Sequence, residues 1–321
     1  MNINEIKLKE LNPKAFIQEQ VESIRKTVGD GLAVVALSGG VDSSVVTLLG
    51  HRALGTRLLA YFIENGIMRA GEPQAVVTAF KKLGVNVEVV DAKAQFFNAL
   101  MGITDPEQKR EAITETFYKL VFGPLVLETG ARYLLQGTIF TDVEETVAGI
   151  KRQHNVLAQI GIDTKVTYGY HVLEPVIQLR KTGVRRVGKA LGLPKAIYDR
   201  PPFPGPALAA RVIGEVTPQR IEAVRAATRV VEEVLLRSGA FQCLAILHED
   251  KVTGIRNGKR EFGYQIEVRC WESTDAVTAT PTRLSWPVLD RLSKRITTEV
   301  PGVVSVTYNI TRKPPSTIEA V

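Results

Sequence analysis

A short turn rich in glycine and serine connects two apolar segments near the start of the 321-residue chain. The turn consists of Ser38, Gly39, Gly40, Val41, Asp42, Ser43 and Ser44. Glycines let backbone N–H groups approach a ligand closely, and the beginning of a helix adds free N–H groups and the positive end of a dipole. Serine hydroxyls add donors, whereas the carboxylate of Asp42 suits a phosphate site mainly when Mg²⁺ lies between them. The pattern therefore predicts a phosphate site with a divalent cation.

The elements on either side of this turn are predicted from their apolar patterns. Residues 33–37 are typical of a strand buried on both faces, and the pattern after the turn fits a helix to about Leu54. Further strands are predicted at 58–63, 85–90 and 132–135, with helices between them. Strands that alternate with helices through short connections predict an α/β fold, a parallel sheet with helices on both faces. Such sheets bind ligands at the carboxyl ends of their strands.

Acidic residues follow the fourth predicted strand. Gly137 comes shortly after it, and Asp142, Glu144 and Glu145 lie a few residues further on. Three carboxylates in this position suit a Mg²⁺ site that is completed by waters and phosphate oxygens. Acidic residues in the first turn of a helix also stabilise the helix dipole without any metal, so both interpretations stay open.

The segment after these carboxylates is predicted to be a lid or a binding loop. Residues 149–163 are polar and have little periodicity, which at this length is typical of a functional loop. His154 in this loop is either a general base or a solvated surface residue. The helix expected after Pro175 carries four basic residues, which we interpret as a solvated face. These are Arg180, Lys181, Arg185 and Arg186.

The composition is that of a soluble globular protein, with 45% hydrophobic and 23% charged residues. A net charge of +7 favours an anionic partner. Because the basic residues are scattered, we expect a small phosphorylated ligand and no nucleic acid. No apolar run approaches the ~20 residues of a membrane span and the first residues are too polar for a signal peptide, so we expect a cytoplasmic protein with no membrane partner. Cys243 and Cys270 can in principle pair, but without a disulfide framework we expect buried apolar residues.

A proline-rich segment at 201–206 marks the predicted domain boundary, because prolines exclude helix and most sheet. We predict one domain at 1–205 and a small α+β domain at 206–321. The expected elements of the second domain are helices from Thr217 to Ser238 and at 287–298, and strands at 244–247, 264–270 and 303–310. The tail after residue 311 has too few apolar residues for a core, which by itself predicts a free tail.

Together these segments resemble the ATP pyrophosphatase subunits of the GMP synthase family, in the form that lacks a fused glutaminase. The SGGVDSS turn resembles the PP-loop of ATP pyrophosphatases, which has no Walker lysine. The resemblance extends over nearly the whole chain. Its other motifs are ENGIMR from Glu64, GITDPEQKR from Gly102, QGT from Gln136, IKRQHNV from Ile150, PFPGPALAAR from Pro202 and KPPSTIE from Lys313.

The resemblance implies a PP-loop domain of the adenine nucleotide alpha hydrolase type, followed by a dimerisation domain. It also implies a ligase that uses ATP and Mg²⁺ to adenylylate the C2 carbonyl oxygen of XMP and releases pyrophosphate. Ammonia from a separate glutaminase then displaces AMP, which forms a C–N bond and gives GMP. We therefore expect a homodimer with a glutaminase partner and small-molecule substrates.

Roles for single residues follow from the same resemblance, position by position. Pyrophosphate contacts are implied for Ser38, Gly39, Gly40, Asp42, Ser43 and Ser44, with Gly137 beside them. Metal contacts are implied for Asp42, Asp142 and Glu145. Catalytic roles are implied for Asp42, for Lys151 and His154 in the lid, and for Lys181. Acceptor contacts are implied for Arg211, Gln242, Lys313, Thr317, Ile318 and Glu319, with the tail holding the ribose phosphate of XMP.

Several positions depart from the family pattern. Gln153 replaces a histidine of the lid, Pro201 replaces a polar residue, and Ala207 replaces a glycine. Thr182 and Gly183 follow Lys181 in this chain, at positions where the family has two carboxylates. Each change alters a group near ATP, metal or XMP. Two alternatives therefore stay open, a diverged PP-loop ligase that adenylylates another purine-like or nucleotide carbonyl for amination or thiolation, and a non-catalytic nucleotide-binding paralogue.

Overall fold

The computed structural model describes residues 3–147, 169–200, 203–235, 238–274 and 277–320. The chain forms two compact units, each of which draws on separate stretches of sequence. The first unit consists of Met1–Glu64, Glu72–Asp91 and Phe117–Arg200. The second unit consists of Asn65–Gly71, Ala92–Thr116 and Pro201–Val321. Within the described ranges, no helix has the length and apolar character that a membrane crossing requires.

The first unit alternates strands and helices. Its strands are β1 (Ala33–Ala36), β2 (Leu58–Glu64), β3 (Val87–Asp91), β4 (Tyr133–Leu135) and β5 (His171–Leu173). Its helices are α1 (Pro13–Val28), α2 (Val41–Leu54), α3 (Glu72–Lys82), α6 (Gly123–Thr129), α7 (Phe140–Val147), α9 (Lys181–Leu191) and α10 (Lys195–Tyr198). Two shorter helical segments are η1 (Gly55–Arg57) and the π-helical η2 (Thr116–Phe122). The sequence predicts β1 to β4 but not the short strand β5.

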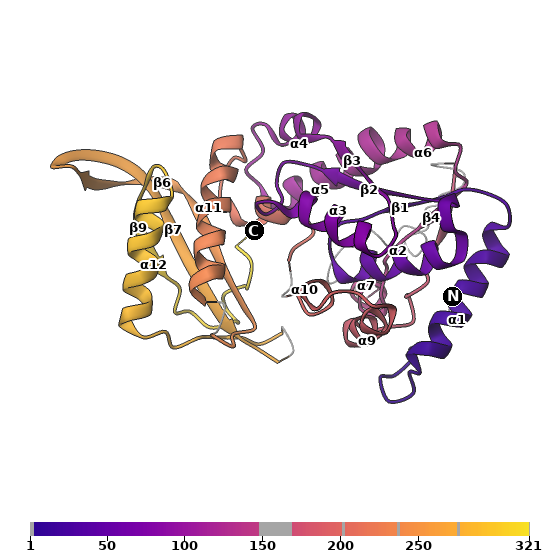
Figure 1. The fold of residues 1–321 in the computed structure, drawn as a ribbon. Coiled ribbons are helices and arrows are strands. Elements are labelled where there is room, and N and C mark those ends of the chain that lie inside the picture. The colour runs from indigo at the N-terminus through magenta and orange to yellow at the C-terminus, as the bar shows by residue number, and fades with distance from the viewer. Residues whose placement is uncertain (1–2, 148–168, 201–202, 236–237, 275–276, 321) are drawn as a thin grey trace. The chain divides into compact units, whose positions relative to one another are not determined.

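The five strands are all parallel and lie in the order β3-β2-β1-β4-β5. Figure 1 shows helices on both sides of this sheet, with α2 on one side and α6 on the other. The predicted fold class is therefore confirmed for this unit. The strand order reverses at β1, because the chain proceeds outward to β2 and β3 and then returns to β4 on the other side. Open parallel sheets bind ligands at such a point, and the glycine-rich turn directly follows β1.

Helix α2 is buried in the first unit and holds the turn in place. Val45, Val46 and Leu49 have no exposed surface, and α2 packs against both α1 and α9. A helix that is apolar nearly all round is held by its neighbours on every side. Its first turn, and with it the phosphate site predicted there, is therefore fixed relative to the sheet.

The second unit is an α+β domain, as predicted. Its helices are α4 (Lys93–Leu100), α5 (Pro106–Glu115), α11 (Pro218–Leu235) and α12 (Trp286–Glu299), with a short 3-10 segment η4 (Ala207–Arg211). Its strands are β6 (Gln242–Arg256), β7 (Lys259–Glu272), β8 (Thr280–Pro281) and β9 (Val303–Tyr308). β6 and β7 pair antiparallel, while β8 (antiparallel) and β9 (parallel) also pair with β7.

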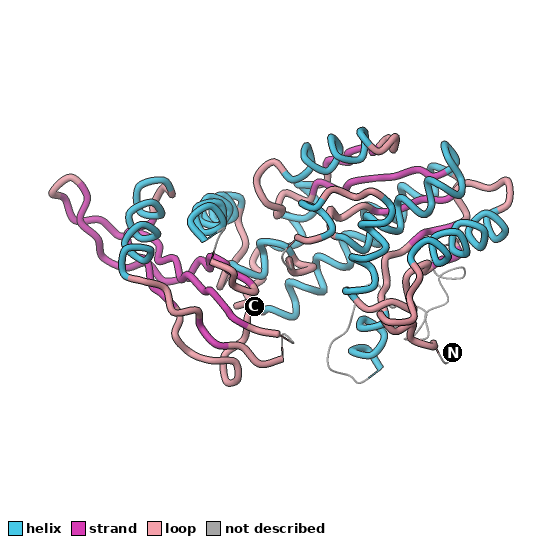
Figure 2. Tube along the Cα trace, turned by 60° about the horizontal axis from the view of Figure 1, so that its bottom comes forward, coloured by secondary structure: helices cyan, strands magenta, loops and turns pink. Residues whose placement is uncertain are grey.

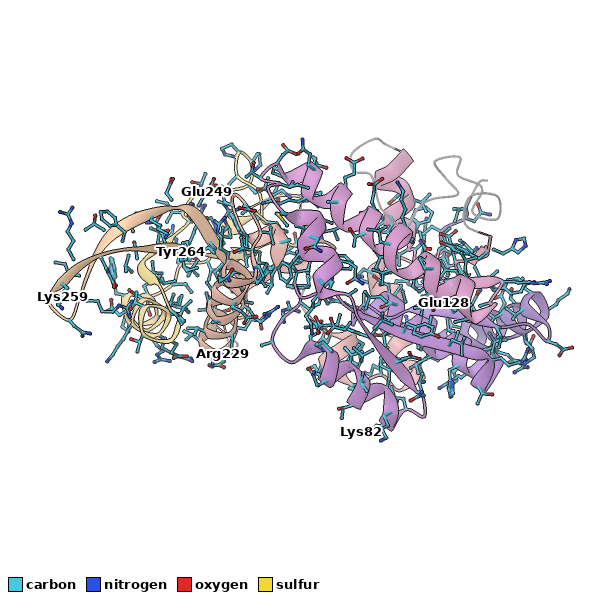
Figure 3. All side chains as sticks on the ribbon, turned by 90° about the horizontal axis from the view of Figure 1, so that it is seen from above. Lys82, Glu128, Arg229, Glu249, Lys259 and Tyr264 are labelled. Atoms are coloured by element: carbon cyan, nitrogen blue, oxygen red, sulfur yellow. The ribbon has the colours of Figure 1, made fainter. Side chains whose placement is uncertain are left out.

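The β6–β7 hairpin is long, and its far end extends beyond α12 (Figure 2). Asn257 and Gly258 at its tip have φ values of 51° and 74°. An Asn-Gly pair with positive φ at both positions is typical of the tight turn that matches the twist of a hairpin. Figure 3 shows Lys259 at this tip and Tyr264 nearer the body of the second unit.

The C-terminal tail is packed onto the second unit, so the prediction of a free tail is wrong. Lys313 and Ala279 exchange two backbone hydrogen bonds, of 2.9 and 3.1 Å. Ile318 is 9% exposed and belongs to a core cluster with Leu244 and Trp271. Backbone pairing and one buried isoleucine hold a segment that composition alone assigns to solvent.

Candidate functional site

The glycine-rich turn is shaped by hydrogen bonds among its own residues. The Oγ of Ser43 accepts the N–H of Ser38 at 3.2 Å, lies 2.9 Å from the Oγ of Ser38 and donates to the C=O of Gly40 at 3.2 Å. Gly39 has a φ of 76°, which favours glycine. Gly40 is the N-cap of α2 and has no side chain to occupy the first N–H groups of the helix. Those N–H groups remain available to an anion.

Asp42 lies in the first turn of α2, and its side chain is 22% exposed. Its Oδ2 accepts a 2.5 Å hydrogen bond from the Nζ of Lys181 at the beginning of α9. Its Oδ1 is buried and has no hydrogen-bond partner among the described residues. Burial raises the pKa of Asp42, while the Lys181 ammonium acts in the opposite direction. A buried carboxylate with one unpaired oxygen favours a second cation.

Asp142 is a second carboxylate whose charge acts on Asp42. Its charge adds to the rise in the pKa of Asp42, and its Oδ2 accepts the N–H of Ile139 at 3.0 Å. The side chain of Glu145 lies outside the described residues, and among the described ones no cluster of three or more His, Cys, Asp or Glu is placed to hold a metal ion. Asp42 and Asp142 nevertheless fit a hard cation whose other ligands are waters and phosphate oxygens, since the Oδ1 of Asp42 has no partner within the described part of the chain.

Gly137 and Ser44 lie in packed surroundings. A Cβ at Gly137 would lie 3.0 Å from the N of Ser43 and 3.1 Å from the carbonyl carbon of Asp42, so glycine lets the loop after β4 approach the first turn of α2. Ser44 is fully buried. The phosphate contacts implied for both residues stay predictions, and so do those of Ser38, Gly39, Gly40 and Ser43.

The structure contains an ion pair beside Gly39 that the sequence does not predict. Glu72, at the beginning of α3, is 4% exposed and accepts a 2.6 Å hydrogen bond from the Nη1 of Arg200. A Cβ at Gly39 would lie 3.0 Å from the Oε1 of Glu72 and 3.7 Å from the Nη1 of Arg200. The pair therefore supports the turn and places a guanidinium next to it. No motif marks these residues, because they come from distant parts of the chain.

The basic residues at the beginning of α9 are exposed or half-buried, as a solvated face requires, and they also have partners. Arg180 forms ion pairs with Glu5 at 3.0 Å and with Glu144 at 2.7 Å. Arg185 donates to the C=O of Arg200 at 3.0 Å, and its charge acts to lower the pKa of Asp42. The helix thus turns part of its positive charge toward the glycine-rich turn. Lys151, Gln153, His154 and Pro201 lie outside the described residues.

In the second unit, three of the predicted acceptor residues form one network. Arg211 is 1% exposed, and its Nε and Nη2 donate to the carboxylate of Glu319 at 3.2 and 3.3 Å. The Nε2 of Gln242 donates to the Oε1 of Glu319 at 2.8 Å. The Nη1 of Arg211 has no partner among the described residues. The network holds the tail and leaves one buried donor of Arg211 without a hydrogen-bond partner among the described residues.

Two other buried cations fix the chain next to Arg211. The Nζ of Lys109 donates to the C=O of Val212 at 2.8 Å, and burial lowers the pKa of Lys109 to about 8. Arg220 donates to the C=O groups of Ile213 and Glu215, at 2.6 Å in each case. The backbone that carries Arg211 is therefore held on its C-terminal side by charged side chains.

Arg269 on β7 is a further residue that the sequence does not reveal. Its Nη1 donates to the C=O groups of Thr317, Ile318 and Glu319 at 2.8, 3.3 and 3.3 Å. Its Nε donates to the Oε1 of Glu267 at 2.5 Å. Burial raises the pKa of Glu267, but hydrogen bonds from His248, Arg269 and Asn309 outweigh it and lower this pKa to about 2.

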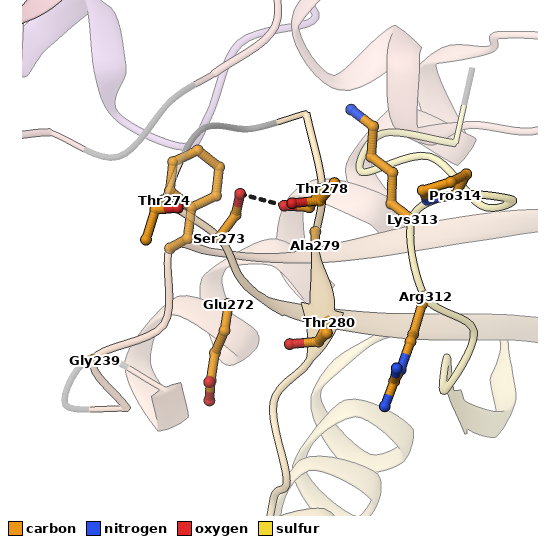
Figure 4. Close-up of a pocket in the computed structure, with 11 residues that line it drawn as sticks. Gly239, Glu272, Ser273, Thr274, Thr278, Ala279, Thr280, Arg312, Lys313 and Pro314 are labelled. Carbon is orange, nitrogen blue, oxygen red and sulfur yellow. Dashed lines mark hydrogen bonds between the residues drawn. The ribbon is translucent and has the colours of Figure 1, made fainter.

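A pocket of about 710 Å³ lies beside the start of the tail in the second unit. Figure 4 shows Lys313 above the strand pair and the hydrogen bond of 2.6 Å from the Oγ of Ser273 to the C=O of Thr278. Lys313 and Arg312 point in opposite directions in this view. Of the predicted acceptor residues, Lys313 lines the pocket, whereas Arg211, Gln242 and Glu319 hold the tail.

Comparisons with known proteins cover nearly the whole chain. The family model described as NAD synthase matches residues 12–205, and the one described as GMP synthase C terminal domain matches residues 230–320. A subunit of the glutamine-hydrolyzing GMP synthase of Archaeoglobus fulgidus is 46% identical, over 96% of this chain and 99% of that one. The chain belongs to this family of GMP synthase subunits. The protein of the same name from Pyrococcus furiosus is 47% identical over 95% of this chain and 96% of its own length, and that of Methanothermobacter thermautotrophicus is 44% identical over 96% and 99%.

Gly39→Ala tests the geometry of the turn. The positive φ strains an alanine by about 1–2 kcal/mol, and the new Cβ would press on Glu72. We expect at least a tenfold weaker affinity for ATP, measured by calorimetry. Gly55→Ala is the matched control, since Gly55 has a φ of 60° and nothing within 4 Å of its Cβ. Equal affinity losses in both variants would mean that general strain, and not the turn, is responsible.

Glu267→Gln tests the charge that holds Arg269. Because the pKa of Glu267 is lowered to about 2, its contribution to stability is present above its ordinary pKa of 4.5 and is lost as the pH falls from there toward 2. We expect the variant to unfold more easily by roughly 1–3 kcal/mol at pH 7, with a smaller difference at pH 3, in urea titrations. Glu261→Gln, an exposed pair member on the same hairpin, should change stability by less than about 0.5 kcal/mol. A pH-independent difference would contradict the ionic role.

Proposed function

We propose that this protein is the ATP pyrophosphatase subunit of a two-subunit GMP synthase. It adenylylates the C2 carbonyl oxygen of XMP with ATP, releases pyrophosphate, and forms GMP and AMP with ammonia. The observation that carries this proposal is the unpaired, buried carboxylate oxygen of Asp42 beside open helix N–H groups at the strand-order reversal, in a chain whose relatives bear the GMP synthase name. This arrangement is suited to the phosphate tail of a nucleotide.

The chemistry explains why ATP is needed. A purine carbonyl oxygen is a poor leaving group, whereas the same oxygen attached to AMP leaves as a stable phosphate ester. The carbonyl oxygen attacks the α-phosphorus, and charge builds on the departing pyrophosphate. The N–H groups at the beginning of α2 and the ammonium of Lys181 would stabilise that charge as it develops, because they are already in position when the reaction begins. Lys151 and His154 remain proposed lid residues.

Asp42 and Asp142 are proposed to hold Mg²⁺, together with Glu145. The ion would neutralise negative charge on the phosphates when it is bound. In the structure described here the ammonium of Lys181 already neutralises one oxygen of Asp42. We infer that Lys181 stays within reach of the phosphates after ATP binds, because its backbone is fixed at the first residue of α9.

The acceptor is proposed to bind the second unit. Arg211, Gln242, Lys313, Thr317, Ile318 and Glu319 are the proposed contacts. Arg211 supports this proposal best, since it is buried and keeps one donor without a partner among the described residues. We further propose that ammonia comes from a separate glutaminase, because the relatives' names describe one subunit of a glutamine-hydrolyzing enzyme. The cytoplasmic location and the homodimer are proposed from the family resemblance alone.

The direct test uses the full-length protein with ATP, Mg²⁺, ammonium and XMP, and follows AMP, pyrophosphate and GMP. Formation of all three in equal amounts supports the proposal. Release of AMP only with a different nucleotide would identify a diverged ligase, and nucleotide binding without turnover would identify a non-catalytic paralogue.

Asp42→Asn should lower the rate of AMP release by on the order of 10²–10³-fold, because the amide neither binds Mg²⁺ strongly nor pairs with Lys181. The fold should remain, as judged by circular dichroism and thermal unfolding. Asp30→Asn, in the exposed turn after α1, is the control and should retain full activity. An active Asp42→Asn enzyme would rule out the role given to this carboxylate.

Removal of the tail after Lys313 should raise the KM for XMP more than tenfold and change the KM for ATP by less than about twofold. Arg211 and Gln242 lose their carboxylate partner in this variant. Because truncation also removes the buried Ile318, Glu319→Gln serves as a milder variant and should shift only the KM for XMP. A parallel loss of ATP affinity in Glu319→Gln would contradict the division of the two sites between the units.

A further inference from the structure

The two cysteines of the chain are direct partners across the β6–β7 hairpin. Cys243 on β6 lies opposite Cys270 on β7 in the strand register. Both are free thiols in this structure. Sequence spacing cannot reveal this relation, since it depends on the register that the hairpin turn sets 14 residues after Cys243, at Asn257.

The type of pairing brings the two side chains close together. The C=O of Cys270 accepts the N–H of Thr282 at 2.8 Å and the hydroxyl of Tyr308 at 3.3 Å, so its backbone groups face away from β6. In an antiparallel sheet, the N–H and C=O of one residue point to the same neighbour. Cys243 and Cys270 therefore form a non-hydrogen-bonded pair, in which the Cα atoms are about 4.5 Å apart. That separation lies within the range of about 4.4–6.8 Å found across disulfides.

The environment of the pair favours stepwise reaction. Cys270 is 1% exposed, whereas Cys243 is only partly buried and its Sγ lies 3.9 Å from the Oγ of Ser238. The interaction between the two thiols raises the pKa of Cys243 and lowers the pKa of Cys270. Cys243 is the less buried of the two thiols, so a reagent meets it first, and its raised pKa makes that step slow. Cys270, whose pKa is lowered, is the better thiolate for the second step.

We propose that Cys243 and Cys270 are a reversible modification site that closes to a cross-strand disulfide within the folded protein. The oxidant is a small disulfide of the glutathione type. Cys243 loses its proton to water, and its sulfur displaces one thiolate from the reagent. Cys270 then loses its proton, and its sulfur attacks the sulfur of Cys243 and displaces the second thiolate. Two electrons and two protons pass from the protein to the reagent, and excess thiol reverses both steps.

The proposed disulfide lies next to two residues that bind the tail. Gln242 precedes Cys243 and Arg269 precedes Cys270, and both hold the tail from the opposite face of the sheet. A covalent bond at this point fixes the spacing of β6 and β7 directly beneath the segment that contains Glu319. The disulfide requires only the strand register, so its formation does not depend on the proposed GMP synthase activity.

The test treats the reduced full-length protein with oxidised glutathione, then blocks free thiols and maps the peptides without reduction. We expect loss of both free thiols, one linked peptide pair that contains positions 243 and 270, and a rise in Tm of roughly 5 °C. Dithiothreitol should reverse all three changes. In Cys270→Ser, the same treatment should stop at a single glutathione adduct on Cys243. In Cys243→Ser, Cys270 should stay unmodified because it is buried.

Two results would overturn the proposal. One is persistence of both free thiols, or of an adduct on Cys243 without closure, in the wild-type chain. The other is a linked pair that forms only with a fall in Tm, because such a bond would require the strands to leave the spacing described here. Both interpretations of the Tm shift assign it to the disulfide. They therefore require that the two serine variants have the same Tm as the reduced wild-type chain.

Discussion

The carboxylate of Asp42 sets the main constraint on the first unit. A carboxylate that is largely removed from water requires positive charge nearby, and three sources converge on this one. The dipole of α2 is positive at its first turn, the ammonium of Lys181 reaches Oδ2, and Arg185 adds charge from further away. The β-sheet brings α2 and α9 together to make this possible. The remaining oxygen, Oδ1, lacks a partner within the described protein, which leaves the site prepared for an ion or a ligand.

The second unit also buries charges that have partners, but with the opposite sign. There the buried charges are cations, and they hold backbone carbonyls and one carboxylate. Lys109 and Arg220 bind carbonyls next to Arg211, while Arg269 binds the carbonyls of the tail. Buried cations without partners would destabilise the fold, so each contact also fixes the chain that supplies it. The tail is therefore part of the domain before any nucleotide arrives.

The sequence predicts local features well and distant pairings poorly. Apolar periodicity gives β1 to β4 and the helices between them, and the SGGVDSS turn predicts a phosphate site, because each of these signals lies within one short segment. The contacts of Lys181 with Asp42 and of Arg200 with Glu72 join residues more than a hundred positions apart. The same holds for Arg211 and Glu319. No periodicity or spacing encodes such contacts, so the prediction of a free tail is wrong because a polar residue shows its charge but not its partner.

Ala207 departs from the family pattern and adopts a backbone conformation that favours glycine. It has a φ of 51°, in the region that favours glycine, and it is 1% exposed. An alanine in this conformation costs about 1–2 kcal/mol, and the surrounding contacts must over-determine it. They do so on both sides, since the N–H of Ala207 donates to Pro204 and the N–H of Leu208 donates to Ile67, at 2.9 Å each. These hydrogen bonds hold the turn that leads to Arg211 with an alanine in the position where the family pattern has glycine. The strained alanine lies in the same 3-10 segment as the buried Arg211, which indicates that the segment keeps this turn, and with it the position of Arg211, in spite of the strain.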